Sequence, residues 1–422
     1  MLDMELGFDI NEVDITLHIA IISFHGCPVA RLGEKDVGGM NVYVLNVAKQ
    51  LACLGHSVDV FTRTHDETDP VIVDLSNNSR VVHIKAGPVD AEKSDLPKYV
   101  DDFVNNVYEF NQGTQKKYDI IHSHYWLSGL AAAVIRDSWN IPLISTFHTL
   151  AKTKLRARPG EQESEERIFH EKLVMNISDG ILVLSEGEAS DIENLYEFKS
   201  GKIDVISAGV DTEMFHPMSK KEAKVKLGIN DIDTLLYVGR IEPIKGLDLL
   251  LDTVALLAKS RDIQLYVVGG SLEKDPELDR LKKKTADLGL DNRVVFKGSV
   301  DQDTLKHYYS ASDVFVLPSF YESFGLVALE AMSCGLPVVA SRVGGIVSFV
   351  RNGENGYLIP WRCPEPYAEK IEVLLSNPDL REFMSQSALQ TANKMSWFDV
   401  ARMMESYYES FISSSYSTSL TL

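Results

Sequence analysis

The chain has 422 residues, of which 45% are hydrophobic and 24% are charged, a balance typical of a globular protein. A chain of this length is too long for one hydrophobic core and suits two domains of roughly 200 residues each. Its formal net charge of -19 argues against nucleic acid or an anionic membrane as the main partner.

The cysteines are too scattered for a disulfide framework or a zinc site, so we expect reduced thiols and no metal ion. There are four of them, Cys27, Cys53, Cys334 and Cys363. The first residues are acidic, unlike the basic and apolar start of a secretion signal. No stretch reaches the ~18 consecutive apolar residues of a membrane span. The sequence therefore predicts a cytoplasmic protein without a membrane partner.

Short β-branched segments alternate with amphipathic segments along the first half, which predicts a parallel sheet wrapped by helices. Apolar residues on one face, ending at Gly55, predict a helix between the first two strands. Ser185 and Glu188 form a capping-box pattern that begins another helix after a strand. The expected strands are Leu17 to Ser23, Ser57 to Thr62, Val81 to Ala86, Asp119 to Ser123, Leu143 to Phe147, Ile181 to Leu184 and Ile203 to Ile206.

The second half repeats this alternation after a break at residues 207–217, where both periodicities stop. Its expected strands are Leu235 to Val238, Gln264 to Val268, Val294 to Phe296, Val314 to Leu317, Pro337 to Ala340 and Tyr357 to Ile359. We expect a domain over residues 1–208, a second over 209–395, and a C-terminal helix that returns toward the first domain, with a polar tail, over 396–422. The fold class is α/β, with two doubly wound, Rossmann-like parallel-sheet domains facing a central cleft, where ligands bind beyond the carboxyl ends of the strands.

A glycine-containing loop separates the first strand from its helix. It lacks the GxGxxG spacing of a dinucleotide-binding fingerprint. Gly38 and Gly39 still allow the backbone to approach a ligand closely and put amides at a helix start. A plain flexible turn is the alternative interpretation.

Histidines follow two neighbouring strands of the first half. His122 and His124 lack a third ligand at a sensible spacing, so we expect no metal there. His148 is well placed to hydrogen-bond a sugar in the cleft, although it could be a structural residue at a strand end. The segment 152–158 holds four cations and no acid, so it is either a local anion site or a mobile loop, and Arg167 follows it on a helix.

Two charged motifs follow strands of the second half. Arg240 and Lys245 sit after its first strand, where a guanidinium and an ammonium can clamp a pyrophosphate. Glu322 and Glu330 lie eight positions apart across a loop that opens a helix, with amides of residues 324–327 between them. Amides at a helix start favour phosphate, and carboxylates accept hydrogen bonds from sugar hydroxyls. We expect both carboxylates to face one crevice that binds a sugar phosphate or nucleotide sugar.

This set of motifs resembles glycosyltransferase family 4, from Ile19 to about Phe411. The resemblance implies the GT-B fold and transfer of a hexosyl group from a nucleotide sugar, with UDP the commoner nucleotide and with retention of anomeric configuration. The nucleotide sugar is a substrate, and no cofactor is required. The motifs around Gly38, His122 and Phe147 are similar to those of D-inositol-3-phosphate glycosyltransferases and, more loosely, sucrose-phosphate synthases.

The resemblance also implies roles for individual residues. The implied catalytic residues are His148, Arg240, Lys245 and Glu322. The implied donor-binding residues are Gly38, Gly39, Arg240, Lys245, Glu322, Ser323, Phe324, Gly325, Leu326 and Glu330, with Glu330 on the ribose hydroxyls. The implied acceptor-binding residues are Asn41, Lys93, Tyr125, Thr149 and Arg167, which suit a small phosphorylated polyol or sugar such as inositol phosphate or a hexose phosphate.

Two alternatives remain at this stage, a GT-B nucleotide-sugar epimerase and a non-catalytic protein that binds sugar nucleotides. An epimerase would convert the donor without an acceptor. A binding protein could lose the clamp residues, all of which are present here. The sequence does not identify the acceptor or the donor sugar. It also does not decide whether the chain forms a homodimer.

Overall fold

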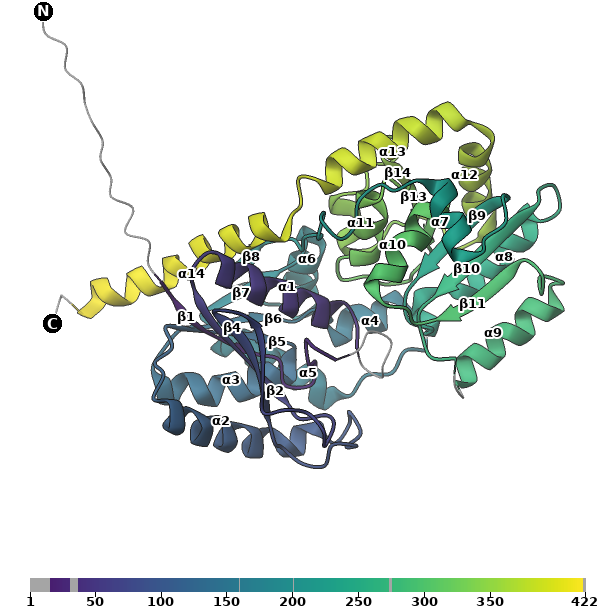
Figure 1. The fold of residues 1–422 in the computed structure, drawn as a ribbon. Coiled ribbons are helices and arrows are strands. Elements are labelled where there is room, and N and C mark those ends of the chain that lie inside the picture. Colours follow the sequence, from purple (N-terminus) through teal and green to yellow (C-terminus); the bar gives the residue numbers. More distant parts are fainter. Residues whose placement is uncertain (1–15, 31–36, 159, 200, 273–274, 420–422) are drawn as a thin grey trace, which may run out of the picture.

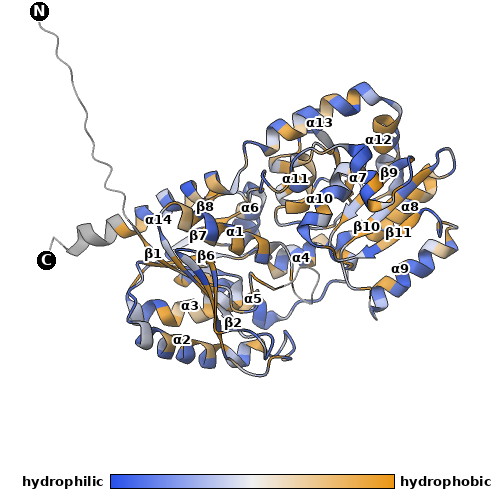
Figure 2. Cartoon of the chain, viewed as in Figure 1, coloured by the Kyte–Doolittle hydropathy of each residue, from blue (hydrophilic) through white to orange (hydrophobic). Residues whose placement is uncertain are grey.

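The computed structural model describes residues 16–30, 37–158, 160–199, 201–272 and 275–419. Two α/β units, each built on its own sheet, lie side by side, and a long C-terminal helix runs back from the second unit to the first (Figure 1). Hydrophobic residues concentrate on the strands and on the helix faces turned toward them (Figure 2). None of the helices in these ranges is long and apolar enough to cross a membrane.

The first sheet has the strand order β3-β4-β2-β1-β5-β6-β7-β8. Its strands are β1 (His18–Ile22), β2 (Ser57–Arg63), β3 (Ile72–Ser76), β4 (Ser79–Ile84), β5 (Ile120–His124), β6 (Leu143–Thr146), β7 (Gly180–Val183) and β8 (Ile203–Val205). The chain adds strands to one side of β1 and then to the other. The chain therefore leaves β1 and β5 toward opposite sides of the sheet. A crevice opens between these two loops at the carboxyl edge.

Strand β3 pairs antiparallel with β4, whereas the sequence predicted an all-parallel sheet. The sequence analysis missed this strand. Its residues are only half buried to exposed, because it lies at the sheet edge and packs one face at most. An edge strand of this kind lacks the continuous apolar run of a buried parallel strand.

The helices of the first unit cover both faces of its sheet (Figure 1). In α1, buried residues such as Tyr43, Val44, Val47 and Leu51 recur at helical spacing against the sheet. Ser185 caps α6 by accepting a hydrogen bond from the amide of Glu188. The helices are α1 (Gly39–Cys53), the short 3-10 helix η1 (Leu96–Tyr99), α2 (Val100–Thr114), α3 (Trp126–Trp139), α4 (Ala151–Ala157), α5 (Glu165–Ile177) and α6 (Glu186–Leu195).

The second sheet is parallel throughout, with the order β11-β10-β9-β12-β13-β14. Its crossover lies between β9 and β12, so the loops after these two strands are neighbours at the carboxyl edge. The strands are β9 (Asp233–Val238), β10 (Ile263–Val268), β11 (Val294–Gly298), β12 (Val314–Leu317), β13 (Val338–Ser341) and β14 (Gly356–Ile359). The helices are α7 (Lys220–Leu227), η2 (Pro243–Lys245), α8 (Leu247–Leu257), α9 (Pro276–Asp287), α10 (Gln302–Ala311), α11 (Leu326–Ser333), η3 (Gly344–Ser348), α12 (Pro364–Ser376), α13 (Pro378–Ala392) and α14 (Trp397–Ser419).

Helix α14 packs against the first unit. The hydroxyl of the fully buried Tyr408 lies 2.6 Å from Nδ1 of His122 on β5, and Glu405 Oε1 lies 3.0 Å from Nε2 of His56. Trp397 also makes an edge contact with the ring of Tyr43 on α1. These contacts link the end of the chain to its first sheet.

Removing the Tyr408 hydroxyl tests this packing. In Tyr408→Phe, the Nδ1 atom of buried His122 loses its hydrogen bond, which costs about 1–3 kcal/mol of unfolding free energy. The control is Tyr108→Phe, which removes an exposed hydrogen bond to the carbonyl of Val134 and changes stability by about 0.5 kcal/mol or less. Urea unfolding followed by circular dichroism measures both, and equal losses in the two variants would contradict the account.

Candidate functional site

A cavity of about 460 Å³ lies between the two units. Its walls come from the carboxyl edges of both sheets, where the loops after β1, β5, β6, β9 and β12 converge. The crossover point of each doubly wound sheet therefore opens into the same space. We call this space the central cleft.

The second unit lines the central cleft with the loop after β12 and the start of α11. Gly325 caps this helix with φ +96°, in the left-handed region that favours glycine. The first amides of α11 have no carbonyl partner within the helix and carry the positive end of its dipole. Ser323, Phe324, Gly325 and Leu326 all border the cleft. This arrangement suits an anion such as a phosphate.

Two cations complete this wall. Arg240 pairs with Glu242 at 2.8 Å and keeps a half-exposed side chain beside the cleft. Lys245 Nζ donates to Glu322 Oε1 at 2.7 Å, and that oxygen also accepts from the Ser319 hydroxyl at 2.7 Å. The ion pair ties the loop after β9 to the loop after β12.

The glycine loop of the first unit faces these groups directly. A Cβ atom on Gly38 would lie 3.8 Å from Nε of Arg240, and one on Gly39 would lie 3.5 Å from Cδ1 of Leu326. A methyl group on either glycine would therefore reach van der Waals contact with the second unit. A diphosphate beside Arg240 would lie against the backbone of Gly38.

The two acids do not face one crevice, contrary to our expectation from their spacing. Glu322 lines a neighbouring cavity of about 500 Å³ behind Tyr321, and Glu330 lines a small cavity of about 20 Å³ with Leu326. The reason is the turn of α11, which carries Glu330 to the buried side of the helix. There the Tyr309 hydroxyl donates to Glu330 Oε2 at 2.8 Å. Burial raises the pKa of Glu330 to about 7, and the Tyr309 hydrogen bond opposes the rise.

His148 lies at the meeting point of the two units. Its φ of +59° is unusual for a residue other than glycine, and the Ser323 hydroxyl of the second unit donates to its carbonyl oxygen. Its Nε2 lies 2.9 Å from Nδ1 of His124, closer than the roughly 3.3 Å between two nitrogen ligands of one zinc ion. Burial lowers the pKa of His148 to about 3, so its imidazole is neutral. A neutral ring suits hydrogen bonding to a sugar.

The opposite wall of the cleft has a cationic cradle around Tyr125. Lys93 Nζ lies 5.3 Å and Arg167 Cζ 5.1 Å from the centre of its ring. Arg167 donates to the carbonyl and hydroxyl oxygens of Thr149 at 3.0 and 3.3 Å. Tyr125 itself has φ +78°. Such backbone strain in a bulky residue is typical of functional sites.

The sequence-predicted residues thus fall into two groups. Those that line the central cleft are Gly38, Gly39, Asn41, Lys93, Tyr125, His148, Thr149, Arg167, Arg240, Lys245, Ser323, Phe324, Gly325 and Leu326. Glu322 contacts this group through Lys245, whereas Glu330 lies one helical turn behind Leu326.

The sequence analysis missed His25 and Tyr321, which also line the cleft. His25 follows β1 directly, so its position after a strand was an available signal. Its buried Nδ1 has no hydrogen-bond partner within the described residues. Burial first, and then the charges of Lys93 and Arg167, hold the pKa of His25 well below its usual range. Its neutral ring can therefore offer a lone pair to a hydroxyl in the cleft.

The cationic segment after Thr149 is not a loop, and Lys154 within it lines the central cleft. It forms helix α4, and each of its cations is engaged by the protein itself. Arg156 pairs with Asp191 at 2.7 Å and Lys154 with Glu163 at 2.5 Å. Lys152 donates to the carbonyl of Leu195. Acidic residues nearby pair with these cations. They come from other positions of the chain, so the sequence could not show the pairing.

The fold and the cleft define a class of protein, the glycosyltransferases of the GT-B fold. Residues 37–214 match the family model described as Glycosyltransferase Family 4, and residues 219–391 match Glycosyl transferases group 1. The chain belongs to glycosyltransferase family 4.

Similar curated proteins support this membership. The D-inositol 3-phosphate glycosyltransferase of Frankia alni is 38% identical over 399 residues, covering 91% of this chain and 97% of that protein. The enzyme of the same name from Corynebacterium diphtheriae is 35% identical over 404 residues, covering 93% and 95%. Sucrose-phosphate synthase from Thermosynechococcus elongatus has a similar structure, with a TM-score of 0.88, 32% identity and coverage of 94% and 100%. The expected family, fold class and hexosyltransferase activity are confirmed.

The raised pKa of Glu330 predicts how this residue affects the stability of the protein at different pH values. Its folded value of about 7 exceeds its ordinary value of 4.5, so the folded protein retains a proton that the unfolded chain releases between these pH values. On its own, this proton makes the contribution of Glu330 to the stability of the folded protein fall as the pH rises from 4.5 to about 7. Glu330→Gln stays neutral and gains on the order of 3 kcal/mol relative to the wild type across this interval. Urea unfolding at several pH values measures the difference, and parallel profiles would refute it.

Proposed function

We propose that this chain transfers a hexosyl group from a nucleotide sugar to a small phosphorylated polyol, with retention of anomeric configuration. UDP is the proposed nucleotide, and inositol phosphate is the acceptor to test first, followed by a hexose phosphate. The observation that carries the proposal is the central cleft, with an anion-binding helix start on one wall and a cationic cradle on the other.

The donor side rests on the groups around α11. In the proposal, the diphosphate lies at the first turn of this helix and contacts Arg240 and Lys245. A diphosphate gains negative charge when it leaves, so cations held beside it stabilise the transition state more than the bound substrate. The ion pair with Glu322 holds Lys245 in place before the donor binds. Glu330 accepts hydrogen bonds from the ribose after a small opening of the cavity that it shares with Leu326.

The acceptor side rests on Lys93, Tyr125, Thr149 and Arg167. Lys93 and Arg167 lie on one wall of the cleft and suit a phosphate group, and Arg167 is held in place by Glu163 and Glu171, each 2.8 Å away. Thr149 adds a hydroxyl held by Arg167. The curated relatives named above carry inositol 3-phosphate in their names, which agrees with a phosphorylated polyol in this position.

The proposed step needs no protein nucleophile. The bond between the anomeric carbon and the departing phosphate oxygen breaks, and the acceptor oxygen forms its new bond on the same face of the sugar. The acceptor proton passes to the departing diphosphate. His148 is neutral and hydrogen-bonds the donor sugar, and the contact of Ser323 with its carbonyl holds the two units together beside that sugar.

A matrix of nucleotide sugars and acceptors, read by mass spectrometry, tests the function. The expected result is a hexosylated acceptor whose formation requires the phosphate, so inositol phosphate reacts and inositol does not. Conversion of the donor sugar without acceptor would favour the epimerase alternative. Tight nucleotide binding without any turnover would favour a non-catalytic protein and would overturn the proposal.

Lys245→Ala tests the donor grip. Loss of a positive group beside the departing diphosphate should lower kcat by roughly 10²- to 10³-fold. The control is Lys259→Ala, an exposed lysine of the same unit, which should leave kcat unchanged. Steady-state assays of nucleoside diphosphate release measure both variants. Wild-type turnover in Lys245→Ala would remove this residue from the donor site.

Lys93→Ala tests the acceptor site separately. Loss of a charged contact with the acceptor phosphate should raise the acceptor KM by roughly 10- to 100-fold and leave the donor KM unchanged. Lys98→Ala is the matched control, because Lys98 is exposed nearby and pairs only with Asp95 among the described residues. An unchanged acceptor KM in Lys93→Ala would contradict the assignment.

A further inference from the structure

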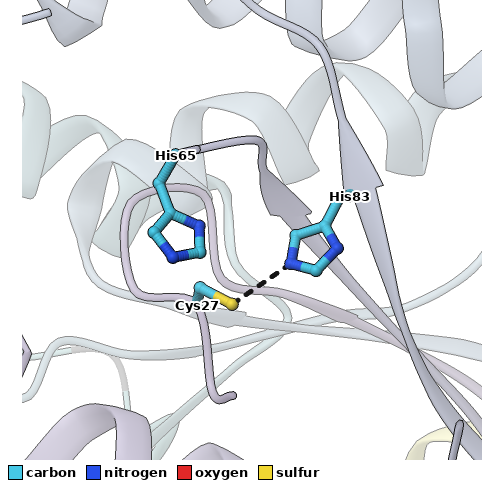
Figure 3. A group of neighbouring side chains, drawn as sticks. All are labelled: Cys27, His65 and His83. Carbon is cyan, nitrogen blue, oxygen red and sulfur yellow. Dashed lines mark hydrogen bonds between the residues drawn. The ribbon is translucent and has the colours of Figure 1, made fainter. Parts of the chain in front are cut away.

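Three side chains with metal-binding atoms meet at the carboxyl edge of the first sheet, outside the central cleft. Cys27 follows β1, His65 follows β2, and His83 lies near the end of β4. One ligand atom from each lies within 4.8 Å of the other two. Figure 3 shows both rings turned toward the sulfur of Cys27. Cys27 and His83 are buried, and His65 is partly exposed.

The far nitrogen of each ring lies within 3 Å of an oxygen atom. His83 Nδ1 donates to the carbonyl of Pro70 at 2.6 Å, and His65 Nδ1 lies 2.9 Å from Oδ2 of Asp69. Asp69 is itself fixed, because its Oδ2 accepts the amide hydrogens of His65 and Asp66. The hydrogen on His83 Nδ1 leaves a lone pair on its Nε2. His65 Nδ1 makes no well-aligned hydrogen bond among the described residues, and the Asp69 carboxylate lies beside it at ion-pair distance. Metal-bound histidines are oriented in this way by carbonyl and carboxylate partners.

We propose that Cys27, His65 and His83 bind a zinc ion. A thiolate and two imidazoles suit zinc and do not suit magnesium or calcium, which prefer oxygen ligands. Ligand atoms of a tetrahedral zinc ion lie roughly 3.3–3.6 Å apart. The distance from Cys27 Sγ to His83 Nε2 is 3.3 Å, and the widest separation closes with a movement of roughly 1 Å. Water completes the fourth position.

The alternative is that this cluster is only a hydrogen bond between the Cys27 thiol and His83. That bond would not require His65. It would not account for a second imidazole at the same point, with its own fixed carboxylate at Asp69. An ion accounts for both rings and for their oxygen partners. No metal was expected from the sequence, because the cysteines are scattered and because His122 and His124 lack a third ligand at a sensible spacing.

The position of the site gives the ion a structural role. The carbonyl of Cys27 accepts from Asn41 Nδ2 at 2.8 Å, and Asn41 Oδ1 accepts from the amide of Gly38 at 3.0 Å. A zinc ion on Cys27 is therefore connected through Asn41 to Gly38, which lines the central cleft. This inference does not depend on the proposed substrates.

Cobalt titration of the full chain tests the site. Protein prepared without a histidine tag is stripped with a chelator, titrated with Co²⁺ and then with Zn²⁺. We expect one Co²⁺ per chain, with the ultraviolet absorption of a sulfur-to-cobalt bond, and its displacement by Zn²⁺. Cys27→Ser should abolish this absorption. Asp69→Asn should retain it and weaken zinc affinity by roughly 10- to 100-fold, because the variant disturbs only the orienting partner.

Matched controls are Cys53→Ser and His216→Gln, which change an exposed thiol and an exposed imidazole. Both should bind cobalt as the wild type does. If Cys27→Ser does not fold, His65→Gln at the partly exposed ring replaces it and should weaken zinc affinity by at least roughly 100-fold. Absence of the sulfur-to-cobalt absorption in the wild type, or its persistence in Cys27→Ser, would overturn the proposal.

Discussion

The contact between the loop after β12 and the loop after β6 is the constraint on which the site depends. The Ser323 hydroxyl donates a hydrogen bond to the carbonyl oxygen of His148. This hydrogen bond joins two units whose sheets share no strand. Because both sheets turn their carboxyl edges to this contact, the first amides of α11 face the glycine loop of the first unit. The cationic cradle around Tyr125 then lies across the same cleft. This contact, together with the packing of α14 on the first unit, holds the two halves of the site opposite each other.

The strand pattern was sufficient to predict most of the fold. Buried parallel strands are continuous apolar segments, so β1 and β12 were visible in the sequence. The edge strand β3 was not, because its residues are half buried to exposed. The shared cleft was also predictable, since loops after strands of two doubly wound sheets must meet where the sheets face each other.

The side-chain environment was the part that the sequence could not reveal. The spacing of Glu322 and Glu330 did not show that α11 turns the second acid toward Tyr309. The cations of residues 152–158 suggested either an anion site or a mobile loop, whereas they lie on and just after α4 and pair with acids of the nearby chain. Cys27 and its two histidines meet only because three strands lie next to one another in the sheet. Each case depends on tertiary contacts between residues distant in sequence.

The central claim is that one cleft holds a nucleotide sugar and a phosphorylated acceptor together. A crystal structure with a nucleoside diphosphate and inositol phosphate tests it most directly. The account predicts the diphosphate within hydrogen-bond distance of Lys245 and the first amides of α11, and the acceptor phosphate on Lys93 or Arg167. A diphosphate bound outside the cleft, with these residues untouched, would contradict it.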